Sequence, residues 1–142
     1  MKGKRSSMQF YLIITGLILI IGFIFFRKGK PPINNILPRE VFEGMKNSDD
    51  NLLLDVRSME EFQSRSGYIK GAKCIPVQGL SKRIEELKPF IGKNIIVYCQ
   101  TGLRSRTAVK ILDSNGYRAL NMTGGLSRWN SEQLPVVMKG KS

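Results

Sequence analysis

The chain has 142 residues, a formal net charge of +12, two cysteines and no histidine. This length accommodates one domain of ordinary size with an appended segment. The absence of histidine excludes a Cys–His dyad, a Ser–His–Asp triad and any histidine-ligated metal. Two cysteines separated by 24 residues form neither a zinc-binding pattern nor a disulfide framework. We therefore expect neither a bound metal nor a cofactor.

The positive charge is unevenly spread along the chain. The first 30 residues hold six basic side chains and no acidic one, whereas the remaining 112 carry 17 basic and 11 acidic residues. Nucleic-acid binding is a common interpretation of such a balance, but no basic stripe with interleaved aromatic residues is present. A membrane surface or small anionic substrates account for the charge better, and we expect no nucleic-acid partner.

Residues 10–26 (FYLIITGLILIIGFIFF) form an uncharged, strongly apolar run after a basic segment at 1–9. At about 1.5 Å per residue, such a helix comes close to crossing a hydrocarbon core of ~30 Å. A secretory signal peptide is the alternative, but its apolar region would be shorter and followed by small residues, whereas FFRKGK follows here. The run predicts an uncleaved, single-pass transmembrane helix. Three cations flank it on each side, so the positive-inside rule does not decide its orientation.

A linker rich in Gly, Pro and Asn at 27–33 leads into a stretch that alternates apolar runs with amphipathic segments. A brief extended piece precedes Pro38, which suits a helix start, with Val41, Phe42 and Met45 on one face of that helix. Strands are expected at 52–56, 72–77, 94–99 and 118–125. Helices are expected at 58–65, 80–90, 105–115 (with Gly116 just past its end) and 126–135. The first of these begins with Ser58 and Glu61 at the spacing of a capping box.

This alternation of strands and helices predicts an open, mainly parallel α/β sheet with helices on both faces. Ligands of such sheets bind beyond the carboxyl ends of the strands. Cys99 ends the apolar run 94–99 and therefore lies at one of these carboxyl ends.

The loop after Cys99 joins that strand to a helix. The first amides of a helix lack intrahelical partners, and Gly102 lets the chain curl so that amides from Gln100 to Ser105 converge on one point. The helix dipole adds positive potential, and we expect Arg104 to contribute a full charge at the rim. A thiol in this cradle is biased toward the nucleophilic thiolate. Packing as a small core hydrophobe is the alternative interpretation of Cys99.

The length of this loop bears on the chemistry. Cysteine phosphatases and related arsenate-handling enzymes place five residues between the cysteine and the arginine, which makes a ring for a tetrahedral oxyanion. Four residues separate Cys99 from Arg104, and six separate Cys99 from Arg106. The tighter cradle favours the terminal sulfur of a persulfide over a phosphate, so a phosphatase is the less favoured interpretation.

Four segments of the chain resemble single-domain rhodanese-like sulfurtransferases. CQTGLRS is similar to the family's active-site loop, and LLLDVRSMEEF resembles its second strand with the following Asp-Val-Arg turn. GYIKGAKCIPV and GYRALNMTGGLSRW resemble its Gly-His-Ile-x-Gly-Ala segment and its closing Gly-Gly-x-x-x-Trp end. The resemblance covers about 34–139, with the motifs in the family's order. Tyr68 stands where the family usually has histidine, at a position that the resemblance assigns to the scaffold.

The resemblance implies a five-stranded parallel sheet and a sulfurtransferase that moves a sulfane sulfur through a Cys99 persulfide. Its donor would be a small molecule such as thiosulfate, and its acceptor a thiol, an acceptor protein or cyanide. Cys99 and Arg104 are the expected catalytic residues. The expected persulfide cradle consists of Gln100, Thr101, Gly102, Leu103 and Ser105. A non-catalytic sulfur-carrier or interaction module tethered at the membrane is the alternative, because its sequence would look the same.

Four further residues have expected roles outside the cradle. Asp55 and Arg57 are predicted to form a structural pair that fastens a strand end. Trp129 is predicted to be a core anchor. Cys74 is predicted to be a buried thiol, with a role as a resolving partner for Cys99 left open. An accessible thiol of low pKa is readily oxidised and needs reducing surroundings, so we expect the domain to face the cytoplasm.

Overall fold

A computed structural model of the chain describes residues 9, 11–19, 33–47 and 51–138. The chain divides into two compact units, Met1–Pro32 and Ile33–Ser142. Residues 11–19 of the first unit are helical. Within the described ranges, no helix has both the length and the apolar character needed to cross a bilayer. The predicted transmembrane helix over 10–26 stays a prediction, since residues 10 and 20–26 lie outside those ranges.

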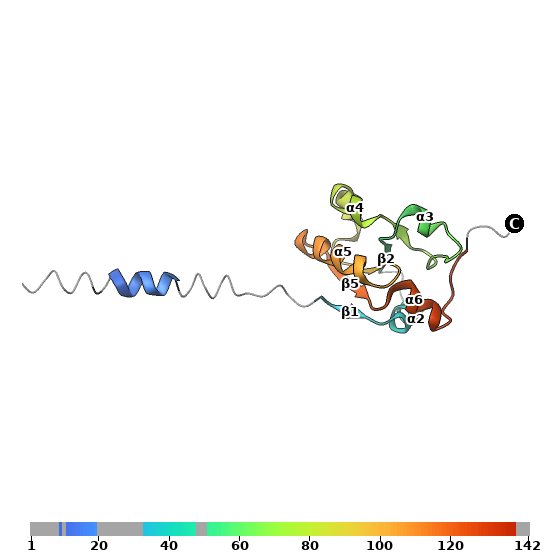
Figure 1. The fold of residues 1–142 in the computed structure, drawn as a ribbon, viewed down its shortest axis with the longest axis horizontal. Coiled ribbons are helices and arrows are strands. Elements are labelled where there is room, and N and C mark those ends of the chain that lie inside the picture. The colour runs from blue at the N-terminus through green and yellow to red at the C-terminus, as the bar shows by residue number, and fades with distance from the viewer. Residues whose placement is uncertain (1–8, 10, 20–32, 48–50, 139–142) are drawn as a thin grey trace, which may run out of the picture. The chain divides into compact units, whose positions relative to one another are not determined.

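The second unit contains a five-stranded sheet whose neighbouring strands all run parallel (Figure 1). Its strands are β1 (Asn35–Ile36), β2 (Leu52–Asp55), β3 (Lys73–Cys74), β4 (Asn94–Tyr98) and β5 (Arg118–Met122). Their order across the sheet is β1-β5-β4-β2-β3, which places β4 at the centre. This arrangement confirms the predicted parallel α/β sheet and the five strands that the family resemblance implies.

Helices pack against both faces of the sheet, as predicted. They are α2 (Pro38–Asn47), α3 (Met59–Phe62), α4 (Val77–Leu80), η1 (Ser81–Phe90), α5 (Leu103–Ser114) and α6 (Gly125–Ser131). One hydrophobic cluster joins side chains of α4, η1 and α5 to one face of β2 and β4. A second cluster joins α2 and α6 to the other face. In Figure 1 these two groups of helices lie on opposite sides of the strands.

The alternation of side chains along the strands explains the two clusters. Leu54 and Val97 belong to the first cluster, and their neighbours Leu53 and Ile96 belong to the second. A strand that is buried on both faces is a near-continuous apolar run, and both strands have this composition. Trp129 of α6 is fully buried in the second cluster, and its indole N–H donates to the carbonyl of Pro135 at 3.0 Å. These contacts fit the predicted role of Trp129 as a core anchor.

The helix predicted over 80–90 differs in type from the observed segment. Residues 77–80 form the short helix α4, and η1 continues as a 3₁₀-helix over ten residues. Runs of 3₁₀-helix longer than three or four residues are uncommon. The spacing of the apolar residues accounts for it. Ile84, Leu87 and Phe90 are three residues apart and all pack on the first cluster, as three residues per turn requires.

Two predicted strands are shorter in the structure. The strand expected over 72–77 is reduced to β3, because Pro76 has no N–H to donate and caps the start of α4. The strand expected over 118–125 ends at Met122, since Gly124 and Gly125 both have positive φ angles, which β-strands do not use. Gly125 then begins α6, and the first amides of this helix donate to carbonyls of Cys99 and Gln100.

Candidate active site

Cys99 directly follows β4, the central strand, and lies at its carboxyl end. The next three residues form the loop, and α5 begins at Leu103. Gly102 caps this helix with a φ of 99°, a left-handed conformation that glycine adopts without steric cost. This conformation turns the Gly102 N–H back toward the cysteine. The local sequence therefore builds a loop that closes around the Cys99 sulfur.

The Cys99 sulfur is surrounded by hydrogen-bond donors. The Gly102 N–H donates to Sγ at 3.1 Å. Burial raises the pKa of Cys99, but the Ser105 amide and hydroxyl and the Gly102 and Thr101 amides outweigh it, so the pKa lies below the ordinary value. The side chain is only 1% exposed, so the expectation of an accessible thiol is wrong for this conformation. The thiolate is stabilised by backbone amides in place of solvent.

A buried polar chain extends from the cysteine into the sheet. Ser105 Oγ lies 3.7 Å from Cys99 Sγ, where either atom can donate. The same hydroxyl donates to Asn121 Oδ1 at 2.6 Å, and Asn121 Nδ2 donates to Asn35 Oδ1 at 2.9 Å. Ser105 has a single hydroxyl proton, so its hydroxyl can donate to only one of these two partners at a time. Asn121 was missed by the sequence analysis. A polar residue between the apolar residues Leu120 and Met122 of β5 was the available signal.

The N-terminus of α6 holds the other side of the loop. The amides of Leu126 and Ser127 donate to the carbonyls of Cys99 and Gln100, both at 2.9 Å. This close approach requires Gly125, since a Cβ there would lie 2.3 Å from the Cys99 carbonyl oxygen, at a φ of 56°. The Gly124-Gly125 pair of the closing motif thus allows α6 to hold the backbone of Cys99 in place.

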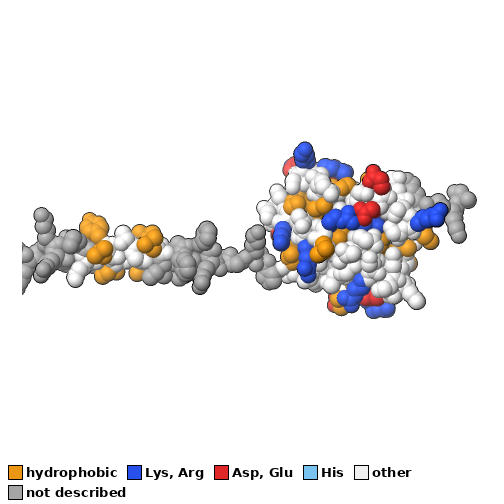
Figure 2. Space-filling model, in the orientation of Figure 1, with side chains coloured by type: hydrophobic (Ala, Val, Ile, Leu, Met, Phe, Trp, Pro, Cys, Tyr) orange, Lys and Arg blue, Asp and Glu red, His pale blue; other side chains and the backbone are white. Residues whose placement is uncertain are grey.

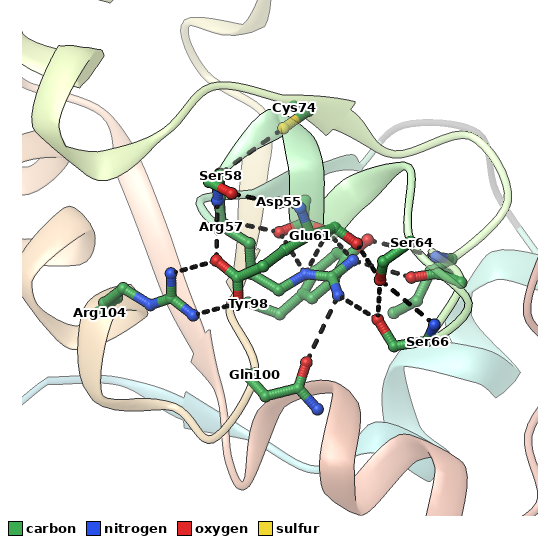
Figure 3. A network of polar contacts seen from close by, with 12 residues as sticks. Asp55, Arg57, Ser58, Glu61, Ser64, Ser66, Cys74, Tyr98, Gln100 and Arg104 are labelled. Carbon is green, nitrogen blue, oxygen red and sulfur yellow. Dashed lines mark hydrogen bonds and ion pairs between the residues drawn. The ribbon is translucent and has the colours of Figure 1, made fainter.

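Asp55 and Arg57 form a fully buried ion pair beside the loop, with 2.7 Å between Nη2 and Oδ2. The guanidinium also donates to Ser66 Oγ at 3.1 Å and to the Gly67 carbonyl at 2.8 Å. Its contact with Gln100 Oε1 is longer, at 3.4 Å (Figure 3). Arg57 therefore ties the end of β2 to the segment at 66–67 and to the loop after Cys99. This geometry fits the supporting role predicted for the pair.

Arg104 lies at the rim, but its charge is not free. Its guanidinium donates to both carboxylate oxygens of Glu61 at 2.6 and 2.7 Å, a bidentate pair drawn in Figure 3. Glu61 also completes the predicted capping box with Ser58. Arg104 thus carries its charge at the rim, but in an ion pair with Glu61 that the sequence analysis did not foresee. The pairing partner could not be inferred from local sequence, because 43 residues separate Glu61 from Arg104.

The remaining predicted residues occupy different environments. Thr101 is exposed, and Leu103 is 71% exposed beside Arg104, whereas Gly102 is buried. Cys74 is half-buried, not fully buried as predicted, and its thiol donates to the Arg57 carbonyl at 3.7 Å. Burial raises the pKa of Cys74 to about 11, so its thiol stays protonated at neutral pH. Of the two cysteines, only Cys99 is primed as a nucleophile.

Tyr68, which replaces the histidine usual in the resembling motif, belongs to the scaffold. Its ring stacks on Phe62 with 4.2 Å between centroids, and its backbone pairs with Val137.

Across residues 9, 11–19, 33–47 and 51–138, no three metal-binding side chains come close enough together to hold an ion. Basic side chains on the visible face of the domain are scattered, several of them beside acidic ones (Figure 2). On that face they form no continuous stripe.

Residues 38–132 match the model of the rhodanese-like domain family. The chain belongs to the rhodanese-like domain family. The match includes β2 with its Asp-Val-Arg turn, the loop after Cys99 and the Gly-Gly pair before α6.

Relatives agree with this assignment to the rhodanese-like family. A sulfurtransferase of Allochromatium vinosum is 30% identical over 106 residues, which are 74% of this chain and 95% of that protein. A putative sulfurtransferase of Bacillus subtilis, YtwF, is 29% identical over 72% of this chain and 96% of its own length. The crystal structure of a rhodanese-related protein from Thermoplasma volcanium superposes with a TM-score of 0.66 at 30% identity, covering 74% of this chain and 98% of that one.

Proposed function

We propose that this rhodanese-like protein is a sulfurtransferase that moves a sulfane sulfur from a donor such as thiosulfate to a thiol or cyanide. The observation that carries the proposal is the environment of Cys99. Its sulfur lies at the end of the central strand, accepts a hydrogen bond from the Gly102 N–H, and has a lowered pKa although it is buried. The similarity to proteins named sulfurtransferases supports the same class of reaction.

In the first step the Cys99 thiolate attacks the outer sulfur of the donor. A new S–S bond forms, the S–S bond within thiosulfate breaks, and its electron pair leaves with sulfite. The enzyme then holds the transferred atom as a persulfide anion, with no net oxidation and no proton needed. We expect the Gly102, Thr101 and Ser105 amides, which lower the pKa of Cys99, to stabilise the negative charge in both states.

In the second step a thiolate or cyanide attacks the terminal sulfur of the persulfide. The enzyme S–S bond breaks, the electron pair returns to Cys99, and the product is a new persulfide or thiocyanate. The chain has no histidine to act as an imidazole general base, so we expect the thiolate to be present before the donor arrives. The amide cradle meets this requirement because it stabilises the ionised sulfur directly.

Steady turnover distinguishes an enzyme from a carrier module. With thiosulfate and cyanide, we expect the full-length chain in mild detergent to release thiocyanate continuously, and we expect the Cys74→Ser variant to do the same. A protein that accepts one sulfur per chain and then stops would instead be a carrier that donates to a partner protein. Release of phosphate from an aryl phosphate, without sulfur transfer, would favour the phosphatase alternative.

We also propose that residues 10–26 anchor the protein in the membrane as a single helix, with the rhodanese-like domain in the cytoplasm. The uncharged apolar run supports the anchor, and the lowered pKa of the Cys99 thiol supports a reducing compartment, since thiolates are the form that oxidises. We expect the full chain to sediment with membranes and a variant lacking residues 1–33 to remain in the supernatant. Trypsin added to intact cells is expected to spare the domain, and cleavage there would contradict the cytoplasmic orientation.

A further inference from the structure

The ion pair between Glu61 and Arg104 lies next to the loop that carries Cys99. Arg104 is in the first turn of α5, five residues after the cysteine, and Glu61 comes from α3. Both side chains are about one-third exposed, Glu61 at 37% and Arg104 at 36%. The pKa of Arg104 is raised by its hydrogen bond to Glu61 and by the nearby charges of Glu61 and Cys99, so an anion that approaches Cys99 also meets the field of this pair.

The Glu61 carboxylate is held on two sides. Its oxygens accept from both terminal nitrogens of Arg104, and Oε2 also accepts from the Ser58 N–H at 3.1 Å. The hydrogen bond from Arg104 lowers the pKa of Glu61 to about 2, so the carboxylate is charged at any working pH. These hydrogen bonds hold the carboxylate beside Arg104 and at the start of its own helix.

This arrangement changes which donors the site favours. A free arginine beside the thiolate would attract a dianion, but here a fixed carboxylate offsets that charge. The neighbouring cation Arg57 is buried and already paired with Asp55. Leu103, between the cysteine loop and Arg104, is 71% exposed and offers apolar surface to an organic group. The surface beside Cys99 therefore combines a cation, Arg104, whose charge is balanced by Glu61 with the exposed aliphatic side chain of Leu103.

We propose that Glu61 is a specificity-determining residue that disfavours dianionic donors, and that the preferred donor is an organic sulfane-sulfur compound with at most a single negative charge. This inference rests on the proposed sulfurtransferase function and narrows its substrate class. Glu61 acts by holding Arg104 and by offsetting its charge, and it takes no part in bond making.

Two donors that react by the same chemistry but differ in charge test the proposal. Thiosulfate is a dianion that releases sulfite, and benzenethiosulfonate is a monoanion that releases benzenesulfinate. The experiment measures kcat/KM for each donor, using the full-length chain in mild detergent with cyanide as acceptor. The Glu61→Gln variant removes the charge while keeping a residue that suits the capping box. We expect it to raise the ratio of thiosulfate to benzenethiosulfonate efficiency by about threefold to tenfold, because the dianion gains twice as much from losing a nearby negative charge.

The Glu86→Gln variant is the matched control. Glu86 is also a paired surface carboxylate whose pKa is lowered to about 2, but its partners are Arg83 and Lys73. We expect this variant to leave the donor ratio unchanged. In a second arm, Leu103→Ala is expected to lower the efficiency with benzenethiosulfonate more than with thiosulfate, because apolar contact with the phenyl ring is lost.

The outcomes separate the two proposals. A donor ratio that stays the same in Glu61→Gln, or an equal loss with both donors, would overturn the specificity role while leaving sulfur transfer intact. If neither donor yields thiocyanate with the unaltered chain, the proposed function itself fails. Rescue of the native ratio by Glu61→Asp, with Glu61→Gln altered, would support a role for charge over shape.

Discussion

We expect the Cys99→Ser variant to lose sulfur transfer, with turnover reduced by about a thousandfold or more. The amides around position 99 can stabilise a thiolate, but the hydroxyl of serine stays protonated near neutral pH. The chain has no histidine that could remove that proton. Thiocyanate release from thiosulfate and cyanide measures the loss directly.

The Cys74→Ser variant is the matched control for this experiment. In the native chain the Cys74 thiol is half-buried and donates to the Arg57 carbonyl. Burial raises its pKa to about 11, so Cys74 is a poor nucleophile. We expect this variant to retain most of the activity. Loss of activity in Cys74→Ser with retention in Cys99→Ser would mean that the nucleophile has been assigned to the wrong residue.

The Asp55→Ala variant is expected to destabilise the domain by about 3–5 kcal/mol, because it leaves the Arg57 guanidinium buried without its counter-ion. Both side chains of this pair are completely shielded from solvent. Arg57 also holds Gly67 and approaches Gln100, so the cysteine loop is expected to loosen as well. Urea unfolding followed by the fluorescence of Trp129, the sole tryptophan of the chain, reports on this domain alone.

Glu85→Ala provides the comparison for this stability measurement. Glu85 pairs with Lys88 at the surface, where both side chains are more than half exposed. Exposed pairs of this kind contribute about 0–1 kcal/mol, so we expect little change in the free energy of unfolding. Equal effects of Asp55→Ala and Glu85→Ala would contradict a special role for the buried pair.

The sequence patterns that predicted the fold correctly are those in which the residues that form an element are also the residues that its place in the fold requires. β2 and β4 are continuous apolar runs, and burial on both faces of a parallel sheet requires that composition. Gly102 was placed in the loop from its position alone, and its left-handed conformation turns an amide toward Cys99. The capping box of Ser58 and Glu61 is equally local and forms as predicted.

The features that the sequence could not show depend on residues brought together only by the fold. Glu61 and Arg104 meet because α3 and the start of α5 both follow the carboxyl ends of neighbouring parallel strands, β2 and β4. No local pattern in the sequence links the two residues. Ser105 and Asn121 meet in the same way, since Ser105 is carried by α5 and Asn121 by β5, and these two elements pack against each other. The burial of Cys99 follows from the packing of α5 against β4, which periodicity alone does not measure.

The most direct test of the central claim is the intact mass of the protein after incubation with thiosulfate. We expect the wild-type chain and the Cys74→Ser variant to gain the mass of one sulfur atom, and to lose it again when cyanide or a thiol is added. The Cys99→Ser variant is expected to keep its original mass throughout. A sulfur adduct that persists in Cys99→Ser, or no adduct on the wild-type chain with any sulfane-sulfur donor, would contradict a persulfide on Cys99.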